Sequence, residues 1–291
     1  MKRKRITVNF IWFLALLSVC LFLMPSITNT YANMVQISRI SGSANVANSM
    51  TDEDIAKEKE KALAYNRKIA EEQMVSPYAY QGQDVTDAEY ESILNMDGNN
   101  NGTMAYIEIP SIDVYLPIAH GTSDAVLAYE AGHMYGSSLP IGGPSSNAMI
   151  AAHTGLPTAR LFSDIKDLKT GDEIFITVLN EIHCYEVTDL HTVPMGPDEQ
   201  QYMQIDGTKD TITLYTCSPY GINSERVLVR AERNPDKDKM VSGEAQERTL
   251  KNKDAAAERK LILMLCIPVL IIILWIASNT YNKKKHNKSN A

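Results

Sequence analysis

The 291-residue chain has few cysteines and no excess of positive charge. Of its four cysteines, Cys20 and Cys266 lie inside long apolar runs, which leaves Cys184 and Cys217 for the middle of the chain. So few cysteines exclude a disulfide scaffold, although a single bridge between these last two stays open. The formal net charge of −7 argues against a nucleic acid as the partner.

The sequence also lacks the spacings of a metal site. Six histidines are present, but no pair follows a His-x-x-x-His pattern and no cysteines follow Cys-x-x-Cys. We therefore expect neither zinc nor another cofactor. Hydrophobic residues make up 44% of the chain, which is enough for a sizeable core.

Long apolar runs lie at both ends, each beside basic residues. An apolar stretch at 10–24 follows a basic N-terminus, so residues 1–32 are predicted to be a signal peptide or an uncleaved membrane anchor. Residues 261–277 are long enough to span a bilayer, and a basic tail follows at 278–291. The positive-inside rule places that tail in the cytoplasm and everything between the two apolar runs outside the cell membrane.

The middle of the chain divides by composition. Residues 33–50 are rich in Ser, Asn and Ala without clear periodicity, and are predicted to be a tether. Residues 51–103 begin with a charged helix that Thr51 caps. Residues 234–260 are charged, show no strand pattern, and are predicted to be a stalk that leads to the C-terminal span.

Short strands with Gly/Pro turns fill the segment 104–233. Many short strands with few helices are typical of a closed β-barrel or a sandwich. The predicted strands cover 104–109, 114–118, 148–152, 173–179, 183–190, 211–216 and 227–231, and short helical pieces lie near 88–94, 123–129, 158–167 and 197–203.

One hairpin carries candidate chemistry. A β-branched strand from Thr211 ends at Cys217, a turn follows, and Arg226 opens the next strand. Alternation places Cys217 on the same strand face as Tyr215. A free cysteine is more often a buried structural residue than a nucleophile, so this hairpin alone does not decide its role.

A histidine elsewhere completes the set. His153 stands at the end of a strand, directly before Thr-Gly-Leu-Pro, where a side chain faces a cleft rather than the core. A thiolate can act as the nucleophile, an imidazole as the proton shuttle, and an arginine as the group that holds an oxyanion or the substrate. His153, Cys217 and Arg226 are the predicted catalytic residues, with Arg230 as the rival for the arginine.

The motifs resemble the sortases, and in detail the pilus-assembling class C of that family. The resemblance covers about residues 51–233 and includes the C-terminal span. The motifs that carry it are His153-Thr-Gly-Leu-Pro157, Thr213-Leu-Tyr-Thr-Cys217 with Arg226 nine positions on, Tyr106-Ile-Glu-Ile-Pro110, Leu116-Pro-Ile118, His120-Gly-Thr122, Ser138-Leu-Pro-Ile-Gly-Gly143, Leu161-Phe162 and Cys217-Ser-Pro-Tyr-Gly-Ile-Asn223.

The resemblance implies a closed, eight-stranded sortase-type β-barrel with short helices, at the surface of a Gram-positive cell. It implies a transpeptidase whose Cys217 attacks the Thr–Gly carbonyl of an LPXTG-like sorting signal on a pilin. His153 would protonate the leaving amine, and Arg226 would stabilise the oxyanion or align the sorting signal. An acceptor amine, usually a pilin lysine, would then resolve the thioester.

The family's lid motif is only partly present. Class C sortases carry Asp-Pro-aromatic before the barrel, whereas this chain has Ser76-Pro77-Tyr78. The resemblance implies a lid in which Tyr78 covers the site without the charged latch. The segment also fits a simple turn that ends the preceding helix.

Two other functions stay open from the sequence. One is a sortase that attaches surface proteins to peptidoglycan rather than polymerising pilins. The other is a non-catalytic, membrane-tethered β-domain that serves as a binding module.

Overall fold

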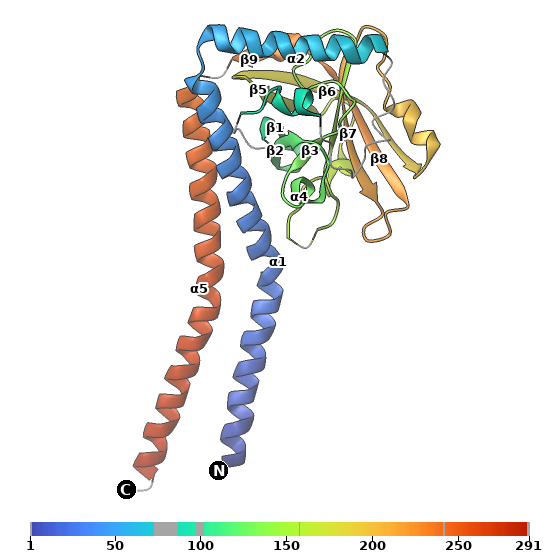
Figure 1. Cartoon of the computed structure of the whole chain (residues 1–291). Helices are drawn as coiled ribbons and strands as arrows, with labels where there is room; N and C mark the ends of the chain where they lie inside the picture. The colour runs from blue at the N-terminus through green and yellow to red at the C-terminus, as the bar shows by residue number, and fades with distance from the viewer. Residues whose placement is uncertain (1, 73–86, 97–101, 157, 241, 290–291) are drawn as a thin grey trace.

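The computed structural model describes residues 2–72, 87–96, 102–156, 158–240 and 242–289. It consists of a β-barrel from which two long helices run away side by side, α1 (Lys2–Ser49) and α5 (Gly243–Ser289) (Figure 1). Both helices contain stretches that are long and apolar enough to cross a membrane. The chain therefore enters the barrel from α1 and leaves it into α5 on the same side.

The predicted tether at 33–50 differs from the structure, because α1 continues without a break to Ser49. The reason is a helical spacing that the small residues obscure in the sequence. Ile37, Ile40 and Ala44 form one buried stripe, and they pack against Tyr106 of the barrel and Leu250 of α5. This part of α1 and the first turns of α5 are thus packed on the barrel, not irregular spacers.

Eight strands form a closed barrel, the architecture that the family resemblance implies. Their order is β5-β1-β2-β3-β4-β7-β8-β6, and pairing of β5 with β6 closes the ring. Most pairs are antiparallel, but β2–β3 and β4–β7 are parallel. The strands are β1 (Thr103–Ile109), β2 (Val114–His120), β3 (Ala131–His133), β4 (Ser146–Ala151), β5 (Glu173–Val178), β6 (Glu181–Pro194), β7 (Asp210–Ser218) and β8 (Glu225–Arg233), with β9 (Lys239–Met240) added at the edge of β6.

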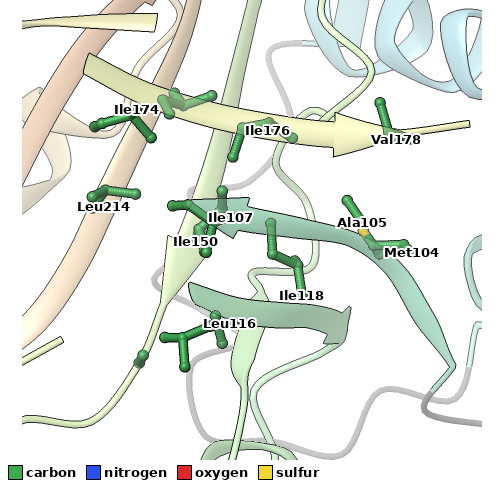
Figure 2. Close-up of a cluster of buried hydrophobic side chains, with 14 of the residues drawn as sticks. Met104, Ala105, Ile107, Leu116, Ile118, Ile150, Ile174, Ile176, Val178 and Leu214 are labelled. Atoms are coloured by element: carbon green, nitrogen blue, oxygen red, sulfur yellow. The ribbon is translucent and has the colours of Figure 1, made fainter. Parts of the chain in front are cut away.

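Alternating residues of these strands fill the barrel. Figure 2 shows Ile107, Ile150, Ile176 and Leu214 converging from four different strands. Each of these four side chains is fully buried. Burial of such a side chain contributes about 1.5–3 kcal/mol to the free energy of unfolding, so these positions hold the strands in register.

Short helices connect and cover the strands. The α2 helix lies across one end of the barrel, where Asn66 bonds the backbone of Leu139 (Figure 1). The predicted helix at 158–167 is mostly wrong: only its last turn is helical, because Leu161 pairs with Thr154 in an extended bridge. The helical elements are α2 (Asp52–Glu72), α3 (Ala88–Ser92), η2 (Pro110–Ile112), α4 (Asp124–Leu127), η3 (Ile165–Asp167), η4 (Pro197–Tyr202) and η5 (Pro235–Lys237).

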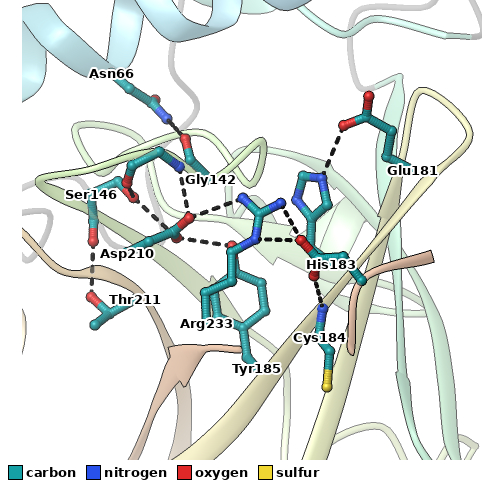
Figure 3. A network of polar contacts seen from close by, with 12 residues as sticks. Asn66, Gly142, Ser146, Glu181, His183, Cys184, Tyr185, Asp210, Thr211 and Arg233 are labelled. Carbon is teal, nitrogen blue, oxygen red and sulfur yellow. Dashed lines mark hydrogen bonds and ion pairs between the residues drawn. The ribbon is translucent and has the colours of Figure 1, made fainter. Parts of the chain in front are cut away.

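A polar network fixes the start of β7 (Figure 3). Asp210 accepts bonds from the Gly143 amide at 2.7 Å, the Tyr185 hydroxyl at 3.1 Å and the Arg233 guanidinium at 3.0 Å. Arg233 also pairs with Asp238 at 2.7 Å. These contacts join β7 to β6, to β8 and to the loop before β4, and thereby set the register in which the other end of β7 meets its neighbours.

Candidate active site

Cys217 lies near the end of β7, on the outer face of the barrel. Ile212 and Leu214 point into the core, so alternation turns Tyr215 and Cys217 to the opposite, outer face of the strand. In the antiparallel β7–β8 ladder Cys217 is paired directly with Arg226. The thiol is half-buried, and the positive charge of its cross-strand neighbour Arg226 acts on it.

His153 reaches the same place from the other side of β7. The parallel register pairs Ala151 with Tyr215, and the Ala152 amide donates to the Tyr215 carbonyl at 3.2 Å. Continued by two residues, this register places His153 beside Cys217, on the same outer face. Neighbouring strands lie ~4.8 Å apart, so a register continued in this way would put the backbones of the predicted histidine and cysteine about that far apart.

The backbone at His153 is bonded on both sides. The Thr216 hydroxyl donates to the Ala152 carbonyl at 2.6 Å and lies 2.7 Å from the Thr154 hydroxyl. The Phe162 amide donates to the carbonyl of His153 itself at 3.1 Å. These bonds give the loop after β4 a fixed position relative to the end of β7.

The loop after Cys217 packs back onto the loop after His153. Gly155 has φ = +74°, and a Cβ at that position would lie 1.6 Å from Cδ2 of Tyr220. Only glycine therefore permits this contact of backbone and ring. The two loops that flank the candidate residues are held against each other at this point.

Arg226 is almost entirely buried, with 7% of its surface exposed. Its Nε donates to the Tyr215 hydroxyl at 2.8 Å. Its Nη1 donates to the carbonyls of Asn223 and Glu225 at 2.8 and 2.9 Å, and its Nη2 contacts the sulfur of Met195 at 2.9 Å. The guanidinium is thus held in one orientation.

Arg230 shares this strand face but stands apart from the thiol. It is paired with Thr213, and its Nη2 donates to the carbonyls of Tyr202 and Gln204 at 3.2 and 2.5 Å. Four residues along a strand correspond to about 13 Å. Of the two predicted arginines, the geometry therefore places Arg226 at the cysteine.

Burial dominates the electrostatics of Cys217. It raises the pKa of the thiol above its ordinary value, Arg226 opposes this effect, and the carboxylate of Glu199 adds to it. Most of the thiol is therefore protonated near neutral pH. A nucleophilic role therefore requires a neighbouring base that removes the thiol proton. His153 is the candidate for this base, because the β4–β7 register leads it toward Cys217.

Other predicted residues lie elsewhere or outside the described part of the chain. The lid residues Ser76, Pro77 and Tyr78 fall in 73–86, outside the described residues. Cys184 is buried on β6 as a free thiol, and no described cysteine forms a disulfide. Among the described residues no cluster of His, Cys, Asp and Glu has the arrangement of a metal site.

Sequence reasoning missed two residues behind Arg226. Tyr215 and Glu199 form a buried hydrogen bond of 2.7 Å that continues from the guanidinium. Tyr215 had a weak signal, because it shares the strand face of Cys217. Glu199 had none, since η4 approaches β7 only in the folded chain.

Comparison with known proteins gives matches over the same region. The model of the sortase domain family matches residues 107–234. Sortase A of Streptococcus agalactiae is 28% identical over 172 residues, 57% of this chain and 68% of that protein. The structure of sortase C-1 from Actinomyces oris is 40% identical with a TM-score of 0.56, covering 63% of this chain and 99% of that one. Sortase A from Corynebacterium diphtheriae is 35% identical with a TM-score of 0.59, covering 71% and 98%.

Proposed function

The chain belongs to the sortase family of cysteine transpeptidases, which act on LPXTG-type sorting signals of surface proteins, and from this membership we propose that it polymerises pilins. We propose Cys217 as its nucleophile, His153 as its proton shuttle and Arg226 as its oxyanion or substrate ligand. The observation that supports this proposal is the strand register. Cys217 pairs with Arg226 across β7 and β8, and the β4–β7 register, which ends at Ala151 and Tyr215, leads toward His153 and Cys217.

The acylation step uses the thiol and the histidine. The Cys217 sulfur, once deprotonated, attacks the threonine carbonyl carbon of the sorting signal, and the carbon–sulfur bond forms as the Thr–Gly bond breaks. His153 delivers the proton to the departing glycine amine. The product is a thioester between the pilin and the enzyme.

Deacylation reverses these roles. An acceptor lysine amine attacks the thioester carbonyl, and the carbon–sulfur bond breaks as an isopeptide bond forms. His153 takes the proton from the amine, and the thiolate is released. Arg226, whose charge is permanent, holds either the oxyanion of both tetrahedral intermediates or the backbone of the sorting signal.

The choice of pilins over peptidoglycan rests on the sequence motifs and on the similarity to a sortase C-1. Relatives named sortase A also match the chain, so a sortase outside class C is the second candidate, and we take attachment of surface proteins to peptidoglycan as its function. In both cases Cys217 forms the same thioester. The two differ in the amine that resolves it.

The acceptor amine decides between them. Purified full-length chain in detergent is incubated with a pilin that carries an LPXTG-like signal, with and without a peptide that mimics the peptidoglycan cross-bridge. We expect covalent pilin multimers on a denaturing gel, and no multimers from Cys217→Ala. Exclusive transfer to the peptide would contradict the pilin assignment, and the absence of any covalent product from the wild-type chain would favour the non-catalytic binding module.

We further propose the arrangement of the chain around this domain. Residues 1–32 form the signal peptide or anchor, 104–233 the catalytic barrel, and 261–277 the membrane span with the tail in the cytoplasm. The two long apolar helices that run side by side support it.

The lid is proposed from sequence alone. Tyr78 covers the site, and the missing carboxylate at Ser76 leaves the cover weakly held. Ser76→Asp is expected to lower transpeptidation and to protect the segment from proteolysis. Unchanged values of both would show that the segment is only a turn.

A further inference from the structure

Two buried polar side chains outside the proposed catalytic set lie behind Arg226. Glu199 of η4 has no exposed surface, and Tyr215 of β7 is 1% exposed. The Tyr215 hydroxyl donates to Oε2 of Glu199 at 2.7 Å, and Nε of Arg226 donates to the same hydroxyl at 2.8 Å. The three groups form one continuous chain of hydrogen bonds.

The far end of this chain is fixed to the backbone. Oε1 of Glu199 accepts the amide of Gly196 at 2.8 Å, so both carboxylate oxygens are bonded. A buried carboxylate is costly unless it is hydrogen-bonded and balanced by a cation. Gly196 and Tyr215 supply the hydrogen bonds, and Tyr215 links the carboxylate to the cation Arg226.

The directions of the bonds leave one edge of the guanidinium for a ligand. A carboxylate can only accept, so the single hydroxyl proton of Tyr215 points to Glu199 and its lone pairs accept from Arg226 Nε. Nη1 is used by two backbone carbonyls. Nη2 contacts only the sulfur of Met195 among the described residues, and a thioether is a weak acceptor.

We propose that Glu199 and Tyr215 are positioning residues that hold the Arg226 guanidinium beside Cys217 with its Nη2 edge toward the sorting signal. This rests on the proposed role of Arg226 in the sortase reaction. Because the Arg226 side chain is already held in one orientation, it loses no rotamer freedom when the oxyanion or the substrate backbone binds to its Nη2 edge.

The charge of Glu199 shows that its contribution is orientation and not activation of the thiol. The carboxylate raises the pKa of Cys217, whereas Arg226 lowers it. Electrostatically, Glu199 therefore opposes the formation of the thiolate. Its benefit to the reaction must come through the arginine that it holds.

The first test detects a displacement of Arg226 through the pKa of Cys217 and does not depend on catalysis. The rate of iodoacetamide alkylation of Cys217 is followed against pH in full-length chain whose other cysteines are replaced by serine. Tyr215→Phe frees the guanidinium, so we expect the pKa of Cys217 to rise toward that of Arg226→Gln. In the Arg226→Gln background Tyr215→Phe should cause no further rise, whereas a general structural effect would add to it.

The second test reads the reaction. Glu199→Gln and Tyr215→Phe are each expected to lower kcat about tenfold or more with little change in KM, as displaced catalytic groups do. The matched control is Tyr202→Phe, a tyrosine of the same η4 helix whose ring stacks on His191. It should keep wild-type kcat and an unchanged Cys217 pKa.

Three outcomes overturn the proposal. The first is that Tyr215→Phe keeps the wild-type kcat and the wild-type pKa of Cys217. The second is that Tyr202→Phe loses as much kcat as Tyr215→Phe. The third is that Tyr215→Phe shifts the pKa of Cys217 by the same amount with and without Arg226. If Tyr215→Phe does not fold, Glu199→Gln decides by kcat alone. Failure here leaves the proposed function standing, because loss of transpeptidation in Cys217→Ala is a separate measurement.

Discussion

At the residue scale, the thiol of Cys217 stands between two opposing influences. Burial raises its pKa, and the guanidinium paired with it across the ladder lowers it. The thiolate fraction therefore grows with pH through a range above that of an ordinary cysteine. In the proposed mechanism Arg226 therefore acts on the nucleophile as well as on the substrate.

The pKa of Cys217 should respond to Arg226 and not to Arg230. Removal of the paired cation in Arg226→Gln leaves burial and Glu199 unopposed, so the alkylation curve of Cys217 moves to higher pH. Arg230→Gln is the matched control, because that side chain bonds the carbonyls of 202 and 204 and should leave the curve in place. A shift in Arg230→Gln alone would reverse the assignment of the two arginines.

A second residue-scale prediction concerns Gly155. Alanine at this position meets both a positive φ and the ring of Tyr220, so the loop after Cys217 must move. We expect Gly155→Ala to lower kcat at least tenfold. Gly171→Ala is the control: its φ is +91° but nothing lies within 4 Å, so backbone strain of about 1–2 kcal/mol should lower stability and leave kcat unchanged.

At the element scale, the site depends on the parallel pairing of β4 with β7. This pairing brings together segments 62 residues apart, as the Thr154–Thr216 hydroxyl contact shows. The hydroxyl of Thr216 bonds both the Ala152 carbonyl and Thr154. This hydroxyl ties the histidine loop to the cysteine strand.

Thr216→Val keeps the shape of the side chain and removes its bonds. The unpaired, buried Ala152 carbonyl should cost about 1–3 kcal/mol of unfolding free energy. Because His153 follows that carbonyl, we also expect kcat to fall ten- to a hundredfold. Thr216→Ser should retain most of both quantities in detergent-solubilised enzyme. Equal activity of the valine and serine variants would show that the hydroxyl does not position the histidine.

The strands of the barrel were predictable where alternation is strong, as in the β-branched run of β7. The three-residue strand β3 was not, because Ala-Gly-His has neither alternation nor β propensity and forms only by pairing with β2 and β4. The same limit applies to the site. Cys217 and Arg226 are joined by a local hairpin, whereas Glu199 joins them only through tertiary packing.

At the scale of the whole molecule, the barrel and the two long helices form one arrangement. Asn9 and Trp275, near opposite ends of the sequence, contact each other at 3.3 Å. Closer to the barrel, Lys253 of α5 pairs with Glu108 and stacks on Tyr115. These contacts fix the barrel relative to the two helices that carry the candidate membrane spans.

The proposed topology predicts which residues are reachable from outside. Single cysteines are introduced as Ser242→Cys and Lys288→Cys in a chain whose four cysteines are replaced. In intact cells a membrane-impermeant maleimide should label the first, and it should label the second only after permeabilisation. Labelling of both in intact cells would contradict two membrane spans with the C-terminus inside.

The proposed thioester at Cys217 is tested most directly by the mass of the acyl-enzyme. Full-length chain in detergent is incubated with a labelled LPXTG peptide, quenched in acid and digested. We expect a hydroxylamine-sensitive adduct on the enzyme peptide that contains Cys217. Its added mass should equal that of the acyl fragment of the LPXTG peptide that ends at threonine. The adduct should be absent from Cys217→Ala and present in Cys184→Ala. An adduct at another residue, or cleavage of the signal by Cys217→Ala, would contradict it.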